Sequence, residues 1–222
     1  MLPAFGDFEA APRLGSEAAA YLASLLTEAA PDLEVVAIAR RPGVLALVAV
    51  RDKGAAVRAV ELVRAQLGTE RIEVVPWDAE PRRFIARALG MAIEPPMVLN
   101  PALGHASVLV GEIDLRGRNG WRGINRLLAS ALTGWRIRLL PIAESAAWRS
   151  LEAACAARRS VLATVVGGTR VNVHGLFAEL PRTLGLPEGH EIEVRLTRMD
   201  ADEGIIRVSP AGASSRQPPL AL

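Results

Sequence analysis

The chain has 222 residues, of which 50% are hydrophobic and only 4% aromatic, and it carries a formal net charge of +2 at pH 7. This length accommodates one large domain or two to three small ones with aliphatic cores. The single cysteine, Cys155, excludes an internal disulfide, and the histidines His105, His174 and His190 lack metal-ligand spacing, so no metal site and no cofactor is expected. No secretion signal opens the chain and no run of about 18 apolar residues occurs, which predicts a cytoplasmic protein without membrane contact.

Charge is unevenly distributed along the chain. Residues 1–34 carry six acidic residues against one arginine, whereas residues 115–138 carry six arginines and no acid. A block of positive charge of this kind favours a polyanionic partner.

The first half of the chain predicts an α/β unit. Ala- and Leu-rich periodicity indicates a helix over residues 15–30, and the Arg41-Pro42-Gly43 turn between two apolar runs indicates an antiparallel hairpin. The further elements expected in this half are strands over 33–39 and 44–50, a helix over 55–67, a strand over 71–75 and a helix over 80–89.

The same pattern recurs further along the chain at a constant offset. Leu67-Gly68 corresponds to Leu132-Thr133, and Pro76 corresponds to Pro141. The elements expected in this copy are strands over 97–99 and 107–110, a helix over 123–132 and a strand over 136–140. An internal repeat of this kind indicates two copies of one α/β unit.

The last third of the chain has a different pattern of predicted elements. A helical connector is expected over residues 142–159, and short β runs with Gly-, Pro- and Asp-containing turns then predict a small barrel over 160–210. The β runs lie at 161–166, 171–180, 191–199 and 204–208. Residues 211–222 are rich in Pro and Ser and are expected to form a disordered tail.

A glycine-rich string precedes the helix of the second copy. Residues 116–126 read Arg-Gly-Arg-Asn-Gly-Trp-Arg-Gly-Ile-Asn-Arg and contain two overlapping Gly-x-x-Gly registers. A turn without side chains lets phosphates approach the backbone, and a helix N-terminus just beyond it adds N–H donors. The candidate RNA-binding residues here are Arg116, Gly117, Arg118, Gly120, Trp121, Arg122, Gly123, Asn125 and Arg126.

These strings resemble the tandem KH region of the bacterial transcription elongation and antitermination factor NusA. The resemblance runs over residues 33–141, and its most specific parts are the glycines at 120 and 123 with Asn125, and the Leu-Thr-Gly-Trp helix end at 132–135. In the first copy it is carried by residues 37–43, 70–77 and 84–89. It implies an α+β fold in which an N-terminal helical segment (1–32) precedes two consecutive type II (prokaryotic) KH domains, at 33–90 and 91–141.

The two copies depart from the family in their loops. At residues 54–57 the first copy reads Gly-Ala-Ala-Val, so one glycine remains and the β-branched Val57 blocks close backbone approach. We therefore expect a structural first KH domain that clamps no RNA. In the second copy Trp121 stands where the family has a lysine, and it either stacks on a base or folds back onto the helix. Glu112 and Asp114, just upstream, are expected to be turn residues.

Residues 160–210 resemble the OB-fold RNA-binding domain named after ribosomal protein S-one. In that family an aromatic-Gly-x-Phe string on the second strand faces single-stranded RNA. Phe177 falls on the Phe and His174 replaces the preceding aromatic residue, so both are candidate RNA contacts; the alternative for Phe177 is a place in the barrel core. The segment is shorter than usual, so we expect a middle strand or loop to be lost, and it follows the KH pair instead of preceding it.

Together these patterns predict a non-catalytic bacterial protein that binds single-stranded RNA and serves transcription elongation or antitermination, with RNA polymerase as a partner. Two alternatives stay open at this point: a ribosome-associated or RNA-processing factor, and a protein-interaction scaffold whose RNA binding has decayed. An enzyme is not expected, because the sequence has no nucleophile–His set, no Walker loop and no paired carboxylates in a recognisable motif.

Overall fold

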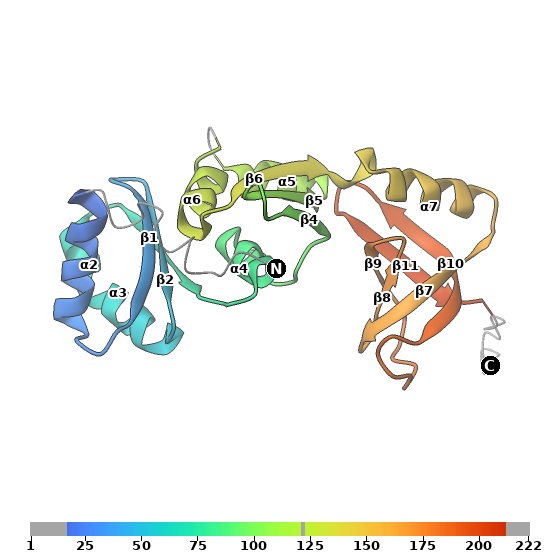
Figure 1. Ribbon diagram of the computed structural model, residues 1–222, viewed down its shortest axis with the longest axis horizontal. Coiled ribbons are helices and arrows are strands. Elements are labelled where there is room, and N and C mark those ends of the chain that lie inside the picture. Colours follow the sequence, from blue (N-terminus) through green and yellow to red (C-terminus); the bar gives the residue numbers. More distant parts are fainter. Residues whose placement is uncertain (1–16, 121–122, 212–222) are drawn as a thin grey trace, which may run out of the picture. The chain divides into compact units, whose positions relative to one another are not determined.

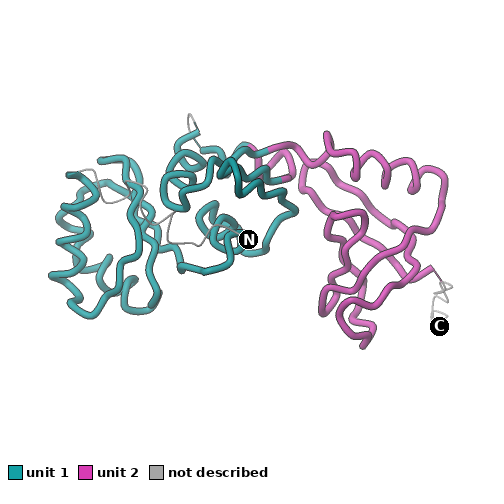
Figure 2. Tube along the Cα trace, in the orientation of Figure 1, with its two compact units in different colours: residues 1–108, 116–139 teal, residues 109–115, 140–222 magenta. Residues whose placement is uncertain are grey.

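The computed structural model describes residues 17–120 and 123–211. It has mixed α and β content and divides into two compact units: residues 1–108 with 116–139, and residues 109–115 with 140–222 (Figure 2). None of the helices in the described ranges is long and apolar enough to cross a bilayer.

The first half of unit 1 is a three-stranded sheet with two helices on one face (Figure 1). Its elements are α2 (Glu17–Ala29), β1 (Val35–Arg41), β2 (Leu45–Val50), α3 (Lys53–Leu67) and β3 (Arg71–Pro76). Strand β2 is central, antiparallel to β1 and parallel to β3. Leu22 and Leu26 of α2 share one core with Val48 of β2 and Val60 of α3. The helix that was predicted as a separate N-terminal segment therefore belongs to this half.

Every residue of β2 is buried, because both faces of the first sheet are covered. Ala46, Val48 and Val50 belong to the core shared with α2 and α3. Side chains alternate along a strand, so the intervening residues, such as Leu47, face the opposite side. Helix α6 of the second half contacts β1 and β2, which joins the two halves into one unit.

The second half of unit 1 repeats the first with an added helix. Its elements are α4 (Pro81–Ala88), β4 (Met97–Asn100), β5 (His105–Val110), α5 (Glu112–Asn119), α6 (Ile124–Thr133) and β6 (Arg136–Pro141), with strand order β4-β5-β6. The last residues of β5 and the first turn of α5 are assigned to unit 2. Helix α4 contacts α6 of this half as well as β3 of the first half.

Helix α5 was not predicted. Glu112 and Asp114, expected in a turn, lie in its first helical turn, and Arg116 and Arg118 lie in its last. Acidic residues near a helix N-terminus and basic residues near its C-terminus stabilise the helix through its dipole. This charge order was readable in the sequence, but the glycine at 117 made the segment resemble a loop.

The first half has no counterpart of α5, and the loop expected at residues 54–57 is not a loop. These residues form the beginning of α3, which runs unbroken for 15 residues. Asp52 precedes the helix and its side-chain oxygen accepts a hydrogen bond from the backbone N–H of Ala55 at 3.1 Å. A side chain in this position stabilises a helix start, and the sequence there is Ala-rich, so helix forms where the second half has a turn.

Unit 2 is a closed five-stranded barrel with a helix packed on it, which is consistent with an OB-like fold (Figure 1). Its strands are β7 (Ser160–Gly167), β8 (Arg170–Val173), β9 (Leu176–Glu179), β10 (Glu191–Asp200) and β11 (Ile205–Pro210), in the closed order β10-β11-β9-β8-β7. The expected single strand over 171–180 is in fact the β8–β9 hairpin. The shortened segment was expected to lose a middle strand or a loop; five strands are present and close the barrel, so it has not lost a strand.

The segment expected to be a connector is part of the barrel unit. It forms the 3-10 helix η2 (Ile142–Glu144) and α7 (Ala146–Ala156). Trp148 and Leu151 of α7 are buried in the same hydrophobic core as Val194 and Ile206 of the barrel. The apolar side of α7 thus closes the barrel core.

Residues 109–115 pack on the turn between β10 and β11. The backbone N–H groups of Glu112 and Ile113 donate to the carbonyl oxygens of Ala201 and Asp202, at 3.3 and 2.9 Å. A Cβ atom at Gly111 would lie only 2.5 Å from the backbone nitrogen of Gly204. This contact brings two backbones together where no side chain fits.

Candidate nucleic-acid interface

The glycine loop, defined here as residues 120–123, connects α5 to α6. Gly120 and Gly123 both have left-handed backbones, with φ of 69° and 74°, and the Gly123 N–H donates to the Gly120 carbonyl at 3.1 Å. Gly117, in contrast, lies inside α5. The second of the two Gly-x-x-Gly registers therefore forms the turn. Trp121 and Arg122 lie outside the described residues.

The loop needs glycine at position 120 for two reasons. Its φ is strained for any residue with a Cβ, and a Cβ there would lie 2.6 Å from Cγ of Asn125. Asn125 itself reaches back across the loop, with its Nδ2 atom 3.5 Å from the carbonyl oxygen of Gly117. Asn125 thus sits on the inside of the turn and supports it.

Helix α6 begins directly at the loop without a side-chain cap. Gly123 is its N-cap residue and supplies no side-chain hydrogen bond to the first turn. The first N–H groups of a helix have no partner within the helix, and they carry the positive end of its dipole. Such a terminus preceded by glycines is a suitable place for a phosphate group.

The arginines near the loop have different roles. Arg118 donates to the carbonyl oxygen of Gly90 at 2.7 Å, and Arg126 donates to the Asn119 Oδ1 and the Ile137 carbonyl at 3.3 and 3.1 Å. These bonds hold the loop and its two helices against the rest of unit 1. The acceptors of Arg126 are neutral oxygens, so these bonds leave its positive charge in place. Arg116 is exposed at the end of α5 and forms no ion pair with a described residue.

The barrel presents a second, separate group of residues. Leu176 and Ala178 of β9 are buried, and Phe177 between them is only partly buried, so its ring faces outward and is not part of the core. The Arg170 guanidinium carbon lies 4.3 Å from the centroid of that ring. An aromatic ring beside a cation is a surface on which a nucleic-acid base stacks well.

His174 and Phe177 were expected on one strand, but His174 lies outside the strand that carries Phe177. It lies at the tip of the β8–β9 hairpin with φ of 53°, followed by Gly175 with φ of 85°. Two consecutive left-handed residues form a type I′ turn, and the Asn172 Oδ1 accepts a hydrogen bond from the Gly175 N–H at 2.9 Å. Arg170 was missed in the sequence. The His-Gly pair was the signal that could have found it. A two-residue turn at 174–175 pairs residue 170 with residue 179, which brings Arg170 close to Phe177.

The described residues contain no cluster of three or more His, Cys, Asp or Glu side chains suited to a metal ion. The Cys155 thiol is partly exposed on α7. Trp135 is buried, whereas Trp77 is partly exposed, with the Arg51 guanidinium carbon 4.3 Å from the centroid of its ring.

Comparison with known proteins supports the resemblance seen in the sequence. No protein-family model matches the chain. It is 35% identical over 117 residues to the transcription termination/antitermination protein NusA of Mycobacterium tuberculosis, which covers 47% of this chain and 34% of the relative. The protein of the same name from Thermus thermophilus is 33% identical over 132 residues, covering 52% of this chain and 34% of the relative. That from Bacillus subtilis is 33% identical over 78 residues. The chain thus resembles NusA and spans about a third of the length of the first two relatives.

Proposed function

We propose that this protein binds single-stranded RNA at the glycine loop and acts as an accessory factor of transcription elongation or antitermination. In this proposal the two halves of unit 1 are type II KH domains and the barrel is an OB-fold RNA-binding domain. The helix–strand–strand–helix–helix–strand order of the second half, with a glycine turn between its consecutive helices, supports the KH assignment. The first half, which lacks that helix pair, serves as a structural support.

One observation carries the proposal: two left-handed glycines stand directly before the uncapped N-terminus of α6. A phosphate can approach this backbone closely and accept hydrogen bonds from the first N–H groups of the helix. The uncompensated charge of Arg116 and Arg126 adds salt-dependent attraction for the neighbouring phosphates. The bases of an unpaired strand then remain free to be read in the groove beside the loop.

The barrel contributes a second RNA contact through Phe177. Its outward ring and the adjacent Arg170 can stack a base without regard to its sequence, and the same face of an OB barrel is a usual nucleic-acid surface. His174, at the tip of the hairpin, is exposed and lies at the margin of this contact.

The role in transcription rests on the relatives, whose names describe termination and antitermination. We propose RNA polymerase as the protein partner and a binding role without catalysis. The resemblance covers the KH region and not the whole of those relatives, so the polymerase contact needs its own test. Co-purification of the tagged full chain with RNA polymerase supports it, and co-purification with ribosomes instead supports the ribosome-associated alternative.

A salt titration of RNA binding tests the loop. The dissociation constant of the full chain for a mixed-sequence single-stranded RNA is measured by fluorescence anisotropy at several salt concentrations. The double variant Gly120→Asp, Gly123→Asp places negative charge against the phosphates and is expected to abolish binding. Val57→Asp, on the exposed side of α3, is the control and is expected to leave the affinity unchanged. Unchanged affinity of a folded double variant shows that the loop is not the RNA site.

A further inference from the structure

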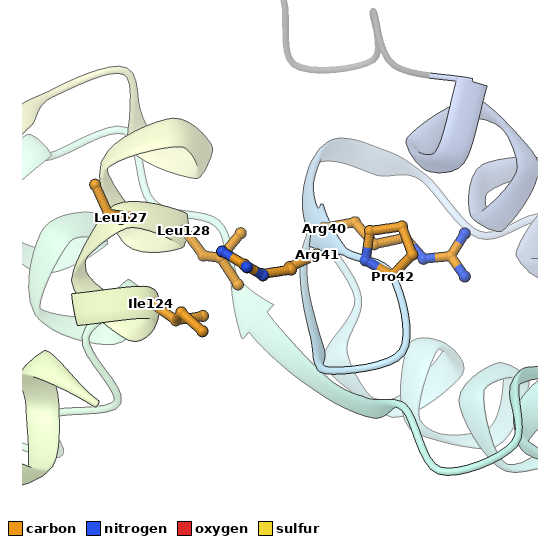
Figure 3. A pocket seen from close by; sticks show the side chains of 6 residues that line it. All are labelled: Arg40, Arg41, Pro42, Ile124, Leu127 and Leu128. Carbon is orange, nitrogen blue, oxygen red and sulfur yellow. The ribbon is translucent and has the colours of Figure 1, made fainter. Parts of the chain in front are cut away.

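A pocket lies beside the glycine loop, between the β1–β2 turn and helix α6 of unit 1 (Figure 3). It has a volume of about 320 Å³ and is lined by Arg40, Arg41, Pro42, Ile124, Leu127 and Leu128. Ile124 is the residue directly after Gly123, so the pocket begins where the loop ends.

The floor of this pocket is apolar. Ile124 and Leu128 are buried, whereas Leu127, which lies between them in the sequence, leaves 51% of its surface exposed. Pro42 faces this floor from the turn (Figure 3). A half-exposed leucine at the edge of a depression can be covered favourably by a flat apolar group.

The rim of the pocket carries a cation without an acidic partner. Figure 3 shows Arg41 extending from the turn toward Leu128, whereas Arg40 points away from α6. Arg40 is fully engaged with the Glu70 carboxylate and the Ala18 carbonyl. Arg41 is exposed, and its side chain forms no ion pair with a described residue.

The turn that presents Arg41 is held in place from behind. The Glu70 carboxylate accepts hydrogen bonds from Arg40 at 2.7 and 3.0 Å and from the backbone N–H of Gly43 at 2.8 Å. These bonds fix Arg40, directly before Arg41, and Gly43, two residues after it. A cation held on a fixed turn loses less conformational entropy on binding than one on a mobile loop.

We propose that this pocket receives the nucleotide next to the one held at the glycine loop: its base rests on Leu127, and its phosphate pairs with Arg41. The inference rests on the proposed RNA binding at the loop. A nucleotide supplies both a flat base for the floor and an anion for the rim. An apolar protein segment fits less well, because it covers Arg41 without supplying the charge that compensates its desolvation.

This arrangement gives the first half of unit 1 a part in RNA binding although it has no glycine loop. A loop of the KH type clamps about four nucleotides. Contact at Arg41 lengthens the bound segment beyond that, so a longer RNA gains affinity from the pocket and a tetranucleotide confined to the loop does not.

The test compares three variants of the full chain by anisotropy with a tetranucleotide and with a mixed-sequence RNA of about ten nucleotides, a length that exceeds the loop's own clamp. Arg41→Glu and Leu127→Asp are each expected to weaken binding of the longer RNA roughly tenfold and to leave the tetranucleotide nearly unaffected. Arg58→Glu, which makes the same charge change at an exposed position of α3, is the matched control and is expected to have little effect. Circular dichroism verifies that each variant is folded.

The outcomes separate this inference from the proposed function. If the loop double variant abolishes binding while Arg41→Glu weakens it no more than Arg58→Glu does, the pocket is not an RNA subsite although the loop is. The inference is also overturned if Arg41→Glu weakens binding of the longer RNA as expected but Leu127→Asp leaves that affinity unchanged, because the base then does not lie on α6. If the wild-type chain binds no RNA, the proposed function and this inference both fail.

Discussion

Arg40 and Glu70 form a two-point ion pair in the interior of unit 1, with Nε to Oε1 at 2.7 Å and Nη2 to Oε2 at 3.0 Å. Their side chains are only 8% and 2% exposed. The pair joins the end of β1 to the residue before β3, and the Gly43 N–H completes the set of bonds to the carboxylate. The shape of the β1–β2 turn therefore depends on Glu70.

Removing this carboxylate is expected to destabilise the protein strongly. Glu70→Ala leaves a buried guanidinium without its partner, and the free energy of unfolding is expected to fall by about 3–5 kcal/mol. Urea denaturation followed by circular dichroism measures the change. Glu73→Ala removes a partner from the exposed pair with Arg71 and is expected to cost less than about 1 kcal/mol. Similar losses in the two variants contradict the role assigned to Glu70.

Low pH is expected to reduce the stability that the Arg40–Glu70 pair contributes. Burial alone raises the pKa of the Glu70 carboxyl, but the hydrogen bonds from Arg40 and Gly43 and the Arg40 charge outweigh this effect and lower the pKa overall. A carboxyl whose pKa is depressed by folding contributes stability above its unfolded pKa, and that stability is lost as the pH falls through the folded pKa. The free energy of unfolding is therefore expected to decrease below pH ~4.3. Glu70→Gln is expected to make the free energy of unfolding less dependent on pH in this range. If the dependence is the same in the variant, Glu70 is not the group responsible.

Two glycines three residues apart are expected to respond oppositely to alanine. Gly117 lies inside α5 with open space around its Cα, so Gly117→Ala is expected to be neutral or to stabilise by up to about 1 kcal/mol. Gly120→Ala introduces a Cβ at a left-handed position against Asn125, and is expected to cost about 1–2 kcal/mol and to weaken RNA binding. Thermal unfolding and anisotropy measure both effects. Equal behaviour of the two variants excludes the turn at residues 120–123.

Alanine substitutions at the neighbouring residues Phe177 and Leu176 are expected to have different effects, the first on RNA affinity and the second on the free energy of unfolding. Phe177→Ala removes an outward ring, so RNA affinity is expected to fall by about 1–3 kcal/mol with little change in unfolding. Leu176→Ala removes a side chain that is 1% exposed, and is expected to cost about 2–5 kcal/mol of stability. A stability loss at Phe177 without a loss of affinity places its ring in a structural role.

The close approach of Gly111 to the β10–β11 turn predicts a strong effect of one added carbon. Gly111→Ala places a Cβ 2.5 Å from the Gly204 nitrogen and 2.6 Å from the Asp202 carbonyl oxygen, and neither backbone atom can turn aside as a side chain can. The variant is expected to lose about 1–3 kcal/mol of stability. Hydrogen exchange at the Ile113 N–H, which donates to Asp202, is expected to become faster. Unaltered exchange indicates that the segment is not held by this turn.

The sequence predicted most elements because their signals are local. Apolar periodicity, the Arg41-Pro42-Gly43 turn and the 65-residue offset between the two copies (from Pro76 to Pro141) were sufficient for the strands of unit 1 and for all of its described helices except α5. Helix α5 was missed because Gly117 is a weak helix former whose conformation depends on its neighbours. The hairpin at His174 was missed because an apolar run on both sides of a two-residue turn reads as one strand.

The candidate site was only partly accessible from the sequence for a different reason. The glycines were identified because a backbone requirement leaves a signature in residue type. The pairing of Arg170 with Phe177, and the approach of Arg41 to Leu128 of α6 (Figure 3), depend on which strands and helices meet in space. The separate roles of Arg40 and Arg41 could not be read either, because adjacent arginines look the same until one of them is found buried against Glu70.

Under the proposed function, the unbroken course of α3 has a consequence for how long the protein stays on a transcript. Two linked clamps act as a chelate, in which one end stays attached while the other rebinds, and the gain in avidity reaches about 10²–10⁴. A chain with one glycine loop forgoes that gain within unit 1. The pocket at Arg41 only extends the segment bound at the loop, so long residence on RNA then requires a second attachment point with a high effective concentration, supplied by the barrel or by a partner that carries the same transcript.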